Sequence, residues 1–147
     1  MRHNSSHPCT HAILWNMREK EFINKVHKAL PSIIYKWKIN DPYHGGVADT
    51  FYSGPKGHCF IEYKYIDQLP IKSTSKIKFN LSAQQRIWLT ERAEHNLFTY
   101  AVLGSGALVY VSEDFTIEHL TVEEFNKGAI PFTTYIEVLT KFCLGET

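Results

Sequence analysis

The sequence has few cysteines and no long apolar run, and each shortage excludes a class of protein. Its three cysteines, Cys9, Cys59 and Cys143, are odd in number and widely spaced. They predict free thiols in a reducing compartment and exclude a disulfide framework. No apolar stretch approaches the roughly 20 residues of a transmembrane helix, and residues 1–6 lack the apolar core of a signal peptide. We therefore expect a cytoplasmic protein without a membrane partner.

Repeats and low-complexity tracts are also missing, so the chain is predicted to fold as one domain. An apolar share of 44% over 147 residues is typical of a globular protein with a single core. We expect that core within residues 17–112. Residues 1–12 are expected to be a flexible lead, and residues 113–147 a C-terminal helical extension.

The small net charge of +1 conceals an uneven distribution. Residues 20–86 contain eleven Lys or Arg against five Asp or Glu, and the rest of the chain is acidic. A basic segment of this kind is typical of a surface that binds phosphate groups. Clustered surface lysines without a ligand are the alternative.

Residues 45–64 contain the most informative pattern of the chain. Two runs rich in strand-forming residues flank Ser53-Gly54-Pro55-Lys56-Gly57, which predicts a β-hairpin. Pairing around the turn brings Asp49 opposite Glu62, and Glu62 and Lys64 share one face because strand side chains alternate. Charged groups among apolar residues are costly unless they are paired or bind a metal. An ordinary ion-pair cluster is the alternative to a functional site.

The residues Asp49 and Glu62-x-Lys64, with the lead-in Gly46-Val47-Ala48-Asp49, resemble the signature of the PD-(D/E)XK nuclease superfamily. Many members have Pro where this chain has Ala48. The resemblance implies an α/β fold with a restriction-endonuclease-like core, in which helices flank a central mixed β-sheet in the order α-β-β-β-α-β.

A helix is predicted over residues 17–30, ending at Pro31. In resolvase-like members of the superfamily, the first helix supplies an acid to the site. Glu19 matches that position and Glu21 is the second choice. Asn16 and Glu19 also fit a helix cap with its reciprocal acid, so the role of Glu19 stays open.

A second helix is predicted to begin at Leu81-Ser82-Ala83-Gln84-Gln85 and to continue through Trp88-Leu89. It is similar to the helix that follows Glu-x-Lys in VRR-NUC-type and related resolvase-like nucleases. In that family a Gln of this helix reaches toward the reacting phosphate, and Gln85 matches it. Ser82 and Gln85 also form a capping box, which is the structural alternative.

The remaining elements are predicted from periodicity and turn residues. We expect strands within residues 32–39, 98–103 and 107–112, and helices over residues 121–128 and 131–143. Residues 68–80 show no clear period and predict a mobile basic loop. The residues expected to contact nucleic acid are Lys56, Lys72, Lys76, Lys78 and Arg86.

The resemblance implies phosphodiester hydrolysis with Mg²⁺, for which Mn²⁺ is the expected substitute. The expected ligands are the carboxylates of Asp49 and Glu62 and the carbonyl of Tyr63, with Glu19 binding a second ion or a water molecule. Lys64 would orient the attacking water or offset phosphate charge, and Gln85 would donate to a phosphate oxygen.

We therefore expect a Mg²⁺-dependent deoxyribonuclease, an endonuclease of the resolvase-like or VRR-NUC-like branch that acts on DNA such as Holliday junctions. A homodimer and a bacterial or phage origin are implied by the resemblance, and no organic cofactor is expected. A non-catalytic nucleic-acid-binding module and an RNA-cleaving nuclease are the alternatives.

Overall fold

Helix α1 (Ser6–Ala29) begins earlier than the sequence pattern predicts. The computed structural model describes residues 6–145, with side chains described from Arg18 onward, so residues 1–5 of the expected lead lie outside the described part. Residues 6–12 are helical, and Pro8 lies in the first turn, where its missing N–H would have no intrahelical partner. Position 16 is in the helix interior, which excludes the predicted cap there. The helix ends before Pro31, as predicted.

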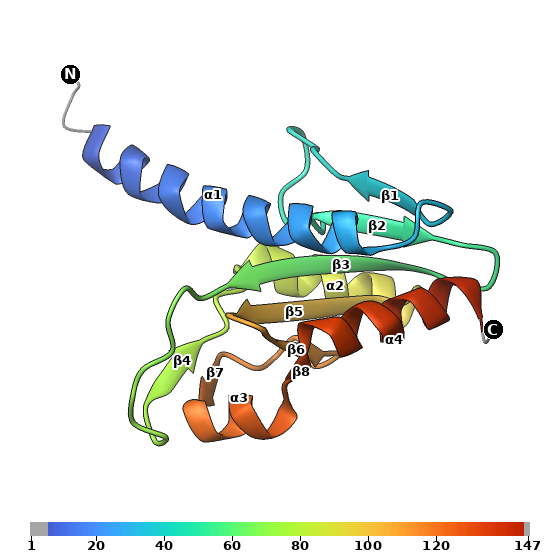
Figure 1. The fold of residues 1–147 in the computed structure, drawn as a ribbon. Coiled ribbons are helices and arrows are strands. Elements are labelled where there is room, and N and C mark those ends of the chain that lie inside the picture. Colours follow the sequence, from blue (N-terminus) through green and yellow to red (C-terminus); the bar gives the residue numbers. More distant parts are fainter. Residues whose placement is uncertain (1–5, 146–147) are drawn as a thin grey trace.

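A six-stranded mixed sheet lies at the centre of the described chain (Figure 1). Its strand order is β1-β2-β3-β5-β6-β8, in which β3 and β5 run parallel and the other neighbours run antiparallel. The strands are β1 (Tyr35–Lys38), β2 (Thr50–Ser53), β3 (His58–Tyr65), β5 (Thr99–Ser105), β6 (Leu108–Ser112) and β8 (Ile130–Pro131). The predicted α/β fold with a mixed sheet flanked by helices is confirmed.

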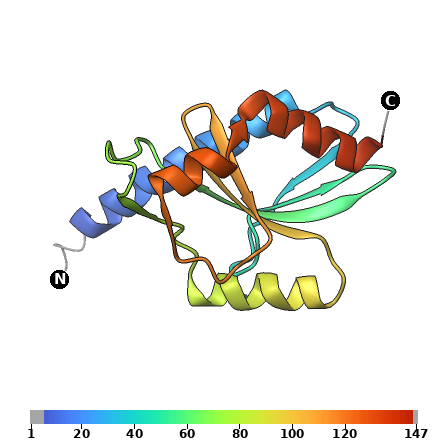
Figure 2. The same cartoon turned by 90° about the horizontal axis from the view of Figure 1, so that it is seen from below.

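Helices cover both faces of this sheet. Figure 2 shows α1 and α4 (Phe132–Leu144) on one side and α2 (Ala83–Glu94) on the other. Phe22 and Val26 of α1 share a buried cluster with Tyr135 and Leu139 of α4 and with Tyr63 of β3. The predicted last helix is thus present, and it completes the core instead of extending from it.

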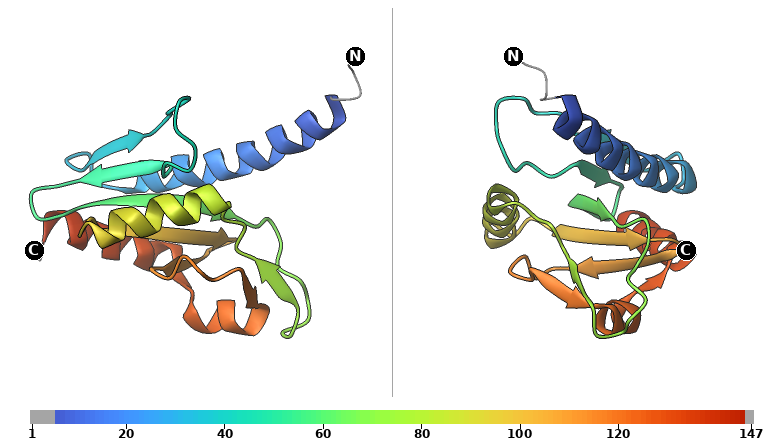
Figure 3. Two further views of the ribbon diagram at one scale, coloured as in Figure 1. Left: turned by 180° about the vertical axis from the view of Figure 1, so that it is seen from behind. Right: turned by 90° about the vertical axis from the view of Figure 1, so that its left-hand side faces the viewer.

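The predicted mobile loop over residues 68–80 contains a strand. β4 (Lys76–Lys78) pairs antiparallel with β7 (His119–Thr121), and α3 (Val122–Gly128) follows directly (Figure 3). Ile77 and Phe79 are buried with Leu120, while Lys76 and Lys78 point outward. A three-residue strand contains too few alternations to be visible in sequence.

The cysteines and the helices agree with the predicted absence of a disulfide framework and of a transmembrane helix in the described residues. Cys59 and Cys143 are buried free thiols, as predicted, whereas the side chain of Cys9 lies outside the described part. In residues 6–145, no helix combines the length and the apolar character that crossing a membrane requires.

Candidate active site

The β2–β3 hairpin has the register that the sequence predicts. Thr50 pairs with Ile61, so the next residues along each strand, Asp49 and Glu62, lie opposite each other. Two hydrogen bonds cross between them. The Asp49 amide donates to Oε1 of Glu62 over 3.1 Å, and the Tyr63 amide donates to Oδ2 of Asp49 over 3.0 Å. The backbone of each strand therefore fixes the carboxylate of the other.

Gln85 serves as helix cap and as site residue at once. Its side-chain oxygen accepts a hydrogen bond from the Ser82 amide, and the Ser82 hydroxyl accepts one from the Gln85 amide, which completes a capping box. The remaining Nε2 donates to Oε2 of Glu62 over 2.9 Å. The predicted capping box is confirmed, and the same amide group also contacts Glu62, because it uses its oxygen for one bond and its nitrogen for the other. The contact of Gln85 with a phosphate stays a prediction.

Lys64 lies beside the same carboxylate. Its ammonium is 3.4 Å from Oε2 of Glu62; the Glu62 side chain is almost completely buried and that of Lys64 is 13% exposed. Strand alternation puts the two side chains on one face of β3. Asp49, Glu62, Lys64 and Gln85, predicted from three separate segments, are thus brought together.

The acids of this cluster have raised pKa values. Burial raises the pKa of Glu62 well above its usual range, and the charge of Asp49 raises it further, against the opposing effect of Lys64. Burial also raises the pKa of Asp49, although the Tyr63 amide and the Lys64 charge act in the opposite direction. A buried and a partly buried acid beside one ammonium favour either a shared proton or an added cation.

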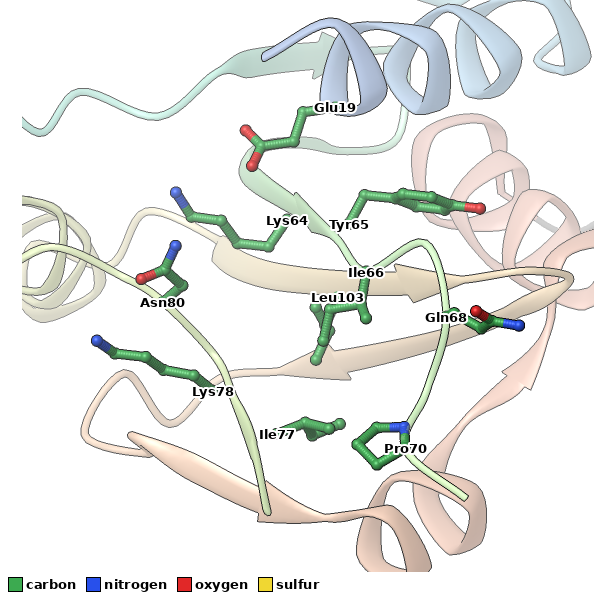
Figure 4. A pocket seen from close by; sticks show the side chains of 10 residues that line it. All are labelled: Glu19, Lys64, Tyr65, Ile66, Gln68, Pro70, Ile77, Lys78, Asn80 and Leu103. Atoms are coloured by element: carbon green, nitrogen blue, oxygen red, sulfur yellow. The ribbon is translucent and has the colours of Figure 1, made fainter. Parts of the chain in front are cut away.

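Glu19, and not Glu21, faces the cluster. Burial raises the pKa of Glu19, while the charge of Lys64 lowers it and that of Asp49 raises it. Glu19 and Lys64 line a pocket of about 390 Å³, where Figure 4 shows the Glu19 carboxylate directed toward the Lys64 ammonium. Glu21 is exposed on α1 and lines a separate cleft with Arg18 and Lys25.

The same pocket contains Asn80, which the sequence analysis missed. Asn80 adopts a left-handed conformation (φ 58°) between β4 and α2, a conformation that Asn tolerates better than most residues. In Figure 4 its amide and the ammonium of Lys78 extend toward the same side of the pocket as Lys64. An Asn directly before a helix-capping sequence is the signal that could have identified it.

The other residues expected to contact nucleic acid are dispersed. Lys78 lines the pocket, and Lys72 and Lys76 are exposed nearby in the chain. Lys56 lies in the β2–β3 turn, at the end of β3 remote from Glu62, where its amide donates to the carbonyl of Cys143. It is not part of the site.

Arg86 is engaged in the fold. Its guanidinium donates to the carbonyl oxygens of Phe115 and Ile117, the latter over 3.0 Å, and so fixes the segment before β7 against α2. The sequence could not reveal this, because both acceptors are backbone groups about 30 residues away. Arg86 therefore has a packing role in the structure, and its contact with nucleic acid stays a prediction.

The donor atoms suit a hydrated cation better than a closed protein cage. In the described part of the chain, no three His, Cys, Asp or Glu side chains are grouped so that they could hold a metal ion together. Glu19 therefore does not complete a three-acid ligand set with Asp49 and Glu62. Mg²⁺ keeps several waters and is commonly bound by one or two carboxylates. Two carboxylates with the Tyr63 carbonyl fit that requirement.

Comparisons with known proteins identify the fold. No family model matches the chain, and no curated protein matches it at a significant level. Among solved structures, the chain is similar to Hjc, a Holliday junction resolvase of the archaeal hyperthermophile Archaeoglobus fulgidus, with a TM-score of 0.51 and 14% sequence identity. The match covers 86% of this chain and 98% of Hjc. The chain has the fold of this resolvase. The VRR-NUC-like branch and the phage origin stay predictions.

Proposed function

We propose that this protein is a divalent-metal-dependent endonuclease that hydrolyses phosphodiester bonds of DNA, with Mg²⁺ as its cofactor. One observation carries the proposal: Asp49, directly before β2, lies opposite Glu62 of β3, with Lys64 and Gln85 on the Glu62 carboxylate. The resolvase fold supports it.

The cation would be held by the carboxylates of Asp49 and Glu62 and by the Tyr63 carbonyl. When bound, it supplies positive charge against the negative charge that develops on the phosphate and the leaving oxygen. The hydrogen bonds from the Asp49 and Tyr63 amides keep both carboxylates in place before the ion arrives. Such preorganisation spares the reaction the cost of arranging them.

The other polar groups act on the phosphate and the attacking water. The Lys64 ammonium neutralises a phosphate oxygen and orients the water. Gln85 keeps the Glu62 carboxylate turned toward the site through its 2.9 Å hydrogen bond, and donates to a phosphate oxygen when that bond yields. Glu19, which faces Lys64 across the pocket, accepts a hydrogen bond from the same water.

The similarity to a Holliday junction resolvase extends the proposal to branched DNA and to a homodimer that presents two such sites. The buried side chains of α4 are not available for that contact. Tyr135, Leu139 and Cys143 of that helix are buried in the protein's own core.

The test is a cleavage panel of linear, flapped, four-way and single-stranded DNA, with a single-stranded RNA, in Mg²⁺ or Mn²⁺. The wild type should cut DNA, and Asp49→Asn, Glu62→Gln and Lys64→Ala should each lose at least about 100-fold in rate. The exposed acid Asp67, paired with Arg18 outside the site, gives the matched control Asp67→Asn, which should cut normally. Tight DNA binding without cleavage in either metal would instead indicate a binding module.

A further inference from the structure

A row of aromatic side chains crosses the sheet beside the candidate active site. Trp37 pairs with Phe51 across β1–β2, and Phe51 pairs with Phe60 across β2–β3. Their ring centroids are 6.4 Å and 4.8 Å apart. Trp88 of α2 meets Phe60 edge to face at 5.2 Å, and the Arg92 guanidinium lies 5.2 Å above the Trp88 ring.

This row is open to solvent at the β1 end. Figure 3 shows α2 crossing in front of β3 and β5 while β1 and β2 stay uncovered on that side. Trp37 is 47% exposed and Tyr43, in the loop between β1 and β2, is 88% exposed. With Phe60, Trp88 and Arg92 they line a groove of about 900 Å³. Such aromatic exposure marks a binding surface more often than chance.

The groove lies next to the acid pair on the same face of the sheet. Phe51 follows Asp49 by two residues and Phe60 precedes Glu62 by two, which is a step of about 7 Å along each strand. Helix α2 runs alongside from the acid pair to the aromatic row. Gln85 contacts Glu62, and Trp88, three residues later in the helix, contacts Phe60. A nucleotide chain with one phosphate at the acid pair would bring a neighbouring base over the aromatic row.

The chemistry of the lining favours a flat, electron-rich ring system next to a phosphate. Aromatic side chains on the face of a sheet stack unpaired bases, and arginine adds a cation–π contribution. The acid of the groove, Asp41, is engaged by His44 over 2.8 Å and by the amides of Tyr43 and His44. The basic residue of the groove, Arg92, lies over the Trp88 ring, with its guanidinium 3.6 Å from the carboxylate of Glu91.

We propose that the groove lined by Trp37, Tyr43, Phe60, Trp88 and Arg92 binds an unpaired nucleobase of the strand whose phosphate lies at Asp49 and Glu62. The inference rests on the proposed nuclease function and narrows its substrate. A base inside a duplex cannot offer its face to a side chain. The preferred DNA therefore has unpaired nucleotides beside the cut, as in a flap, a gap or a free single strand.

The test measures binding without cleavage. Full-length protein in EDTA is titrated with a fluorescently labelled thymidine oligonucleotide of about 10 nucleotides, with the same strand carrying abasic sites, and with the corresponding duplex. Affinity is followed by anisotropy and base contact by quenching of tryptophan fluorescence. The exposed variants Trp37→Ala and Tyr43→Ala are compared with Trp37→Phe and with Tyr35→Ala. Tyr35 is 59% exposed on the same strand but does not line the groove.

Wild type should bind the thymidine strand roughly tenfold more tightly than the abasic strand. Trp37→Ala and Tyr43→Ala should lose a similar factor on the thymidine strand and none on the duplex, while Trp37→Phe and Tyr35→Ala should bind normally. Equal affinity of wild type and both alanine variants for the thymidine strand overturns the inference. The inference is also overturned if Trp37→Ala changes the oligomeric state but not the affinity for the thymidine strand. That result would make the groove a contact between two copies of the protein. If the wild type shows these binding differences but does not cleave DNA in Mg²⁺ or Mn²⁺, the nuclease proposal is contradicted and the base-binding inference is not.

Discussion

Asp49 and Glu62 are connected in both directions across the β2–β3 hairpin. The amide of Asp49 binds the Glu62 carboxylate, and the amide that follows Glu62 binds the Asp49 carboxylate. Neither acid can turn away without breaking a hydrogen bond to the opposite strand. The fold thus keeps the buried carboxylate of Glu62 adjacent to the partly buried one of Asp49, at a cost in stability that a bound cation would remove.

This cost predicts an unusual pH dependence in the absence of divalent cations. Burial raises the folded-state pKa values of Asp49 and Glu62 above their unfolded values, so the folded protein keeps protons that the unfolded chain has released. The contribution of this pair to the free energy of unfolding therefore falls as pH rises from about 4.5 through the folded pKa values. Asp49→Asn keeps an acceptor for the Tyr63 amide and removes the repulsion. It should be more stable than wild type at pH 7 by about 0.5–2 kcal/mol.

Urea unfolding in EDTA between pH 5 and pH 8 measures this difference. His27, whose pKa burial and nearby Lys38 and Lys36 lower to about 4, affects wild type and variant alike, so the difference isolates the acid pair. A variant less stable than wild type at pH 7 would contradict the strain argument.

The two glutamates of α1 provide a matched pair for catalysis. Glu19→Gln should reduce the cleavage rate by about 10- to 100-fold, because the half-buried carboxylate that faces Lys64 is lost. Glu21→Gln, an exposed change two residues away, should leave the rate unchanged. Single-turnover cleavage at saturating DNA compares them. Equal rates would remove Glu19 from the site.

A buried chain of hydroxyl groups anchors β3 behind the site. Tyr52 bonds to His27 over 2.8 Å and to Tyr63 over 3.0 Å, and Tyr63 bonds to Tyr135 over 2.7 Å. Tyr63→Phe removes the middle hydroxyl and leaves Tyr135 without this partner. We expect it to cost about 2–3 kcal/mol, against about 1 kcal/mol for Tyr135→Phe at the end of the chain. Denaturant unfolding gives both values, and equal costs would show that the chain does not act as a unit.

Gly46 and Gly106 test the packing of the loop before Asp49 against α2. Both have positive φ, +84° and +58°, so alanine at either position costs about 1 kcal/mol in backbone strain. A Cβ at Gly106 meets open space, whereas one at Gly46 would overlap the carbonyl of Gln84, the residue before Gln85. Gly46→Ala should therefore lose more stability than Gly106→Ala and should also reduce cleavage. Matching stability and activity in the two variants would contradict this packing.

The central hairpin could be predicted from sequence because its information is local. The turn residues around Pro55 set the register, and the register alone puts Asp49 opposite Glu62. The same locality explains why the cap at Ser82 could be predicted. The two contacts of the Gln85 amide group could not be predicted, because helical periodicity does not indicate which side-chain atom lies against Glu62.

Non-local pairing explains what the sequence did not predict. β4 and β7 are three residues each and are separated by α2, β5 and β6, so neither has a local signal for its partner. The bonds from Arg86 to the carbonyl oxygens of Phe115 and Ile117 could not be predicted either, because the charge of a side chain does not indicate which distant backbone groups it will contact. The aromatic row could not be predicted from sequence, because Trp37, Phe51 and Phe60 belong to three strands and form one surface only after these strands pair.

The central claim is that Asp49 and Glu62 hold a divalent cation, and calorimetric titration with Mn²⁺ tests it most directly. Wild type should bind the ion with proton release at pH 6, because the acids must lose the protons they share before they coordinate it. Asp49→Asn and Glu62→Gln should lose at least about tenfold in affinity, whereas Asp67→Asn should bind as the wild type does. The same affinity and the same proton release in all four proteins would contradict the account.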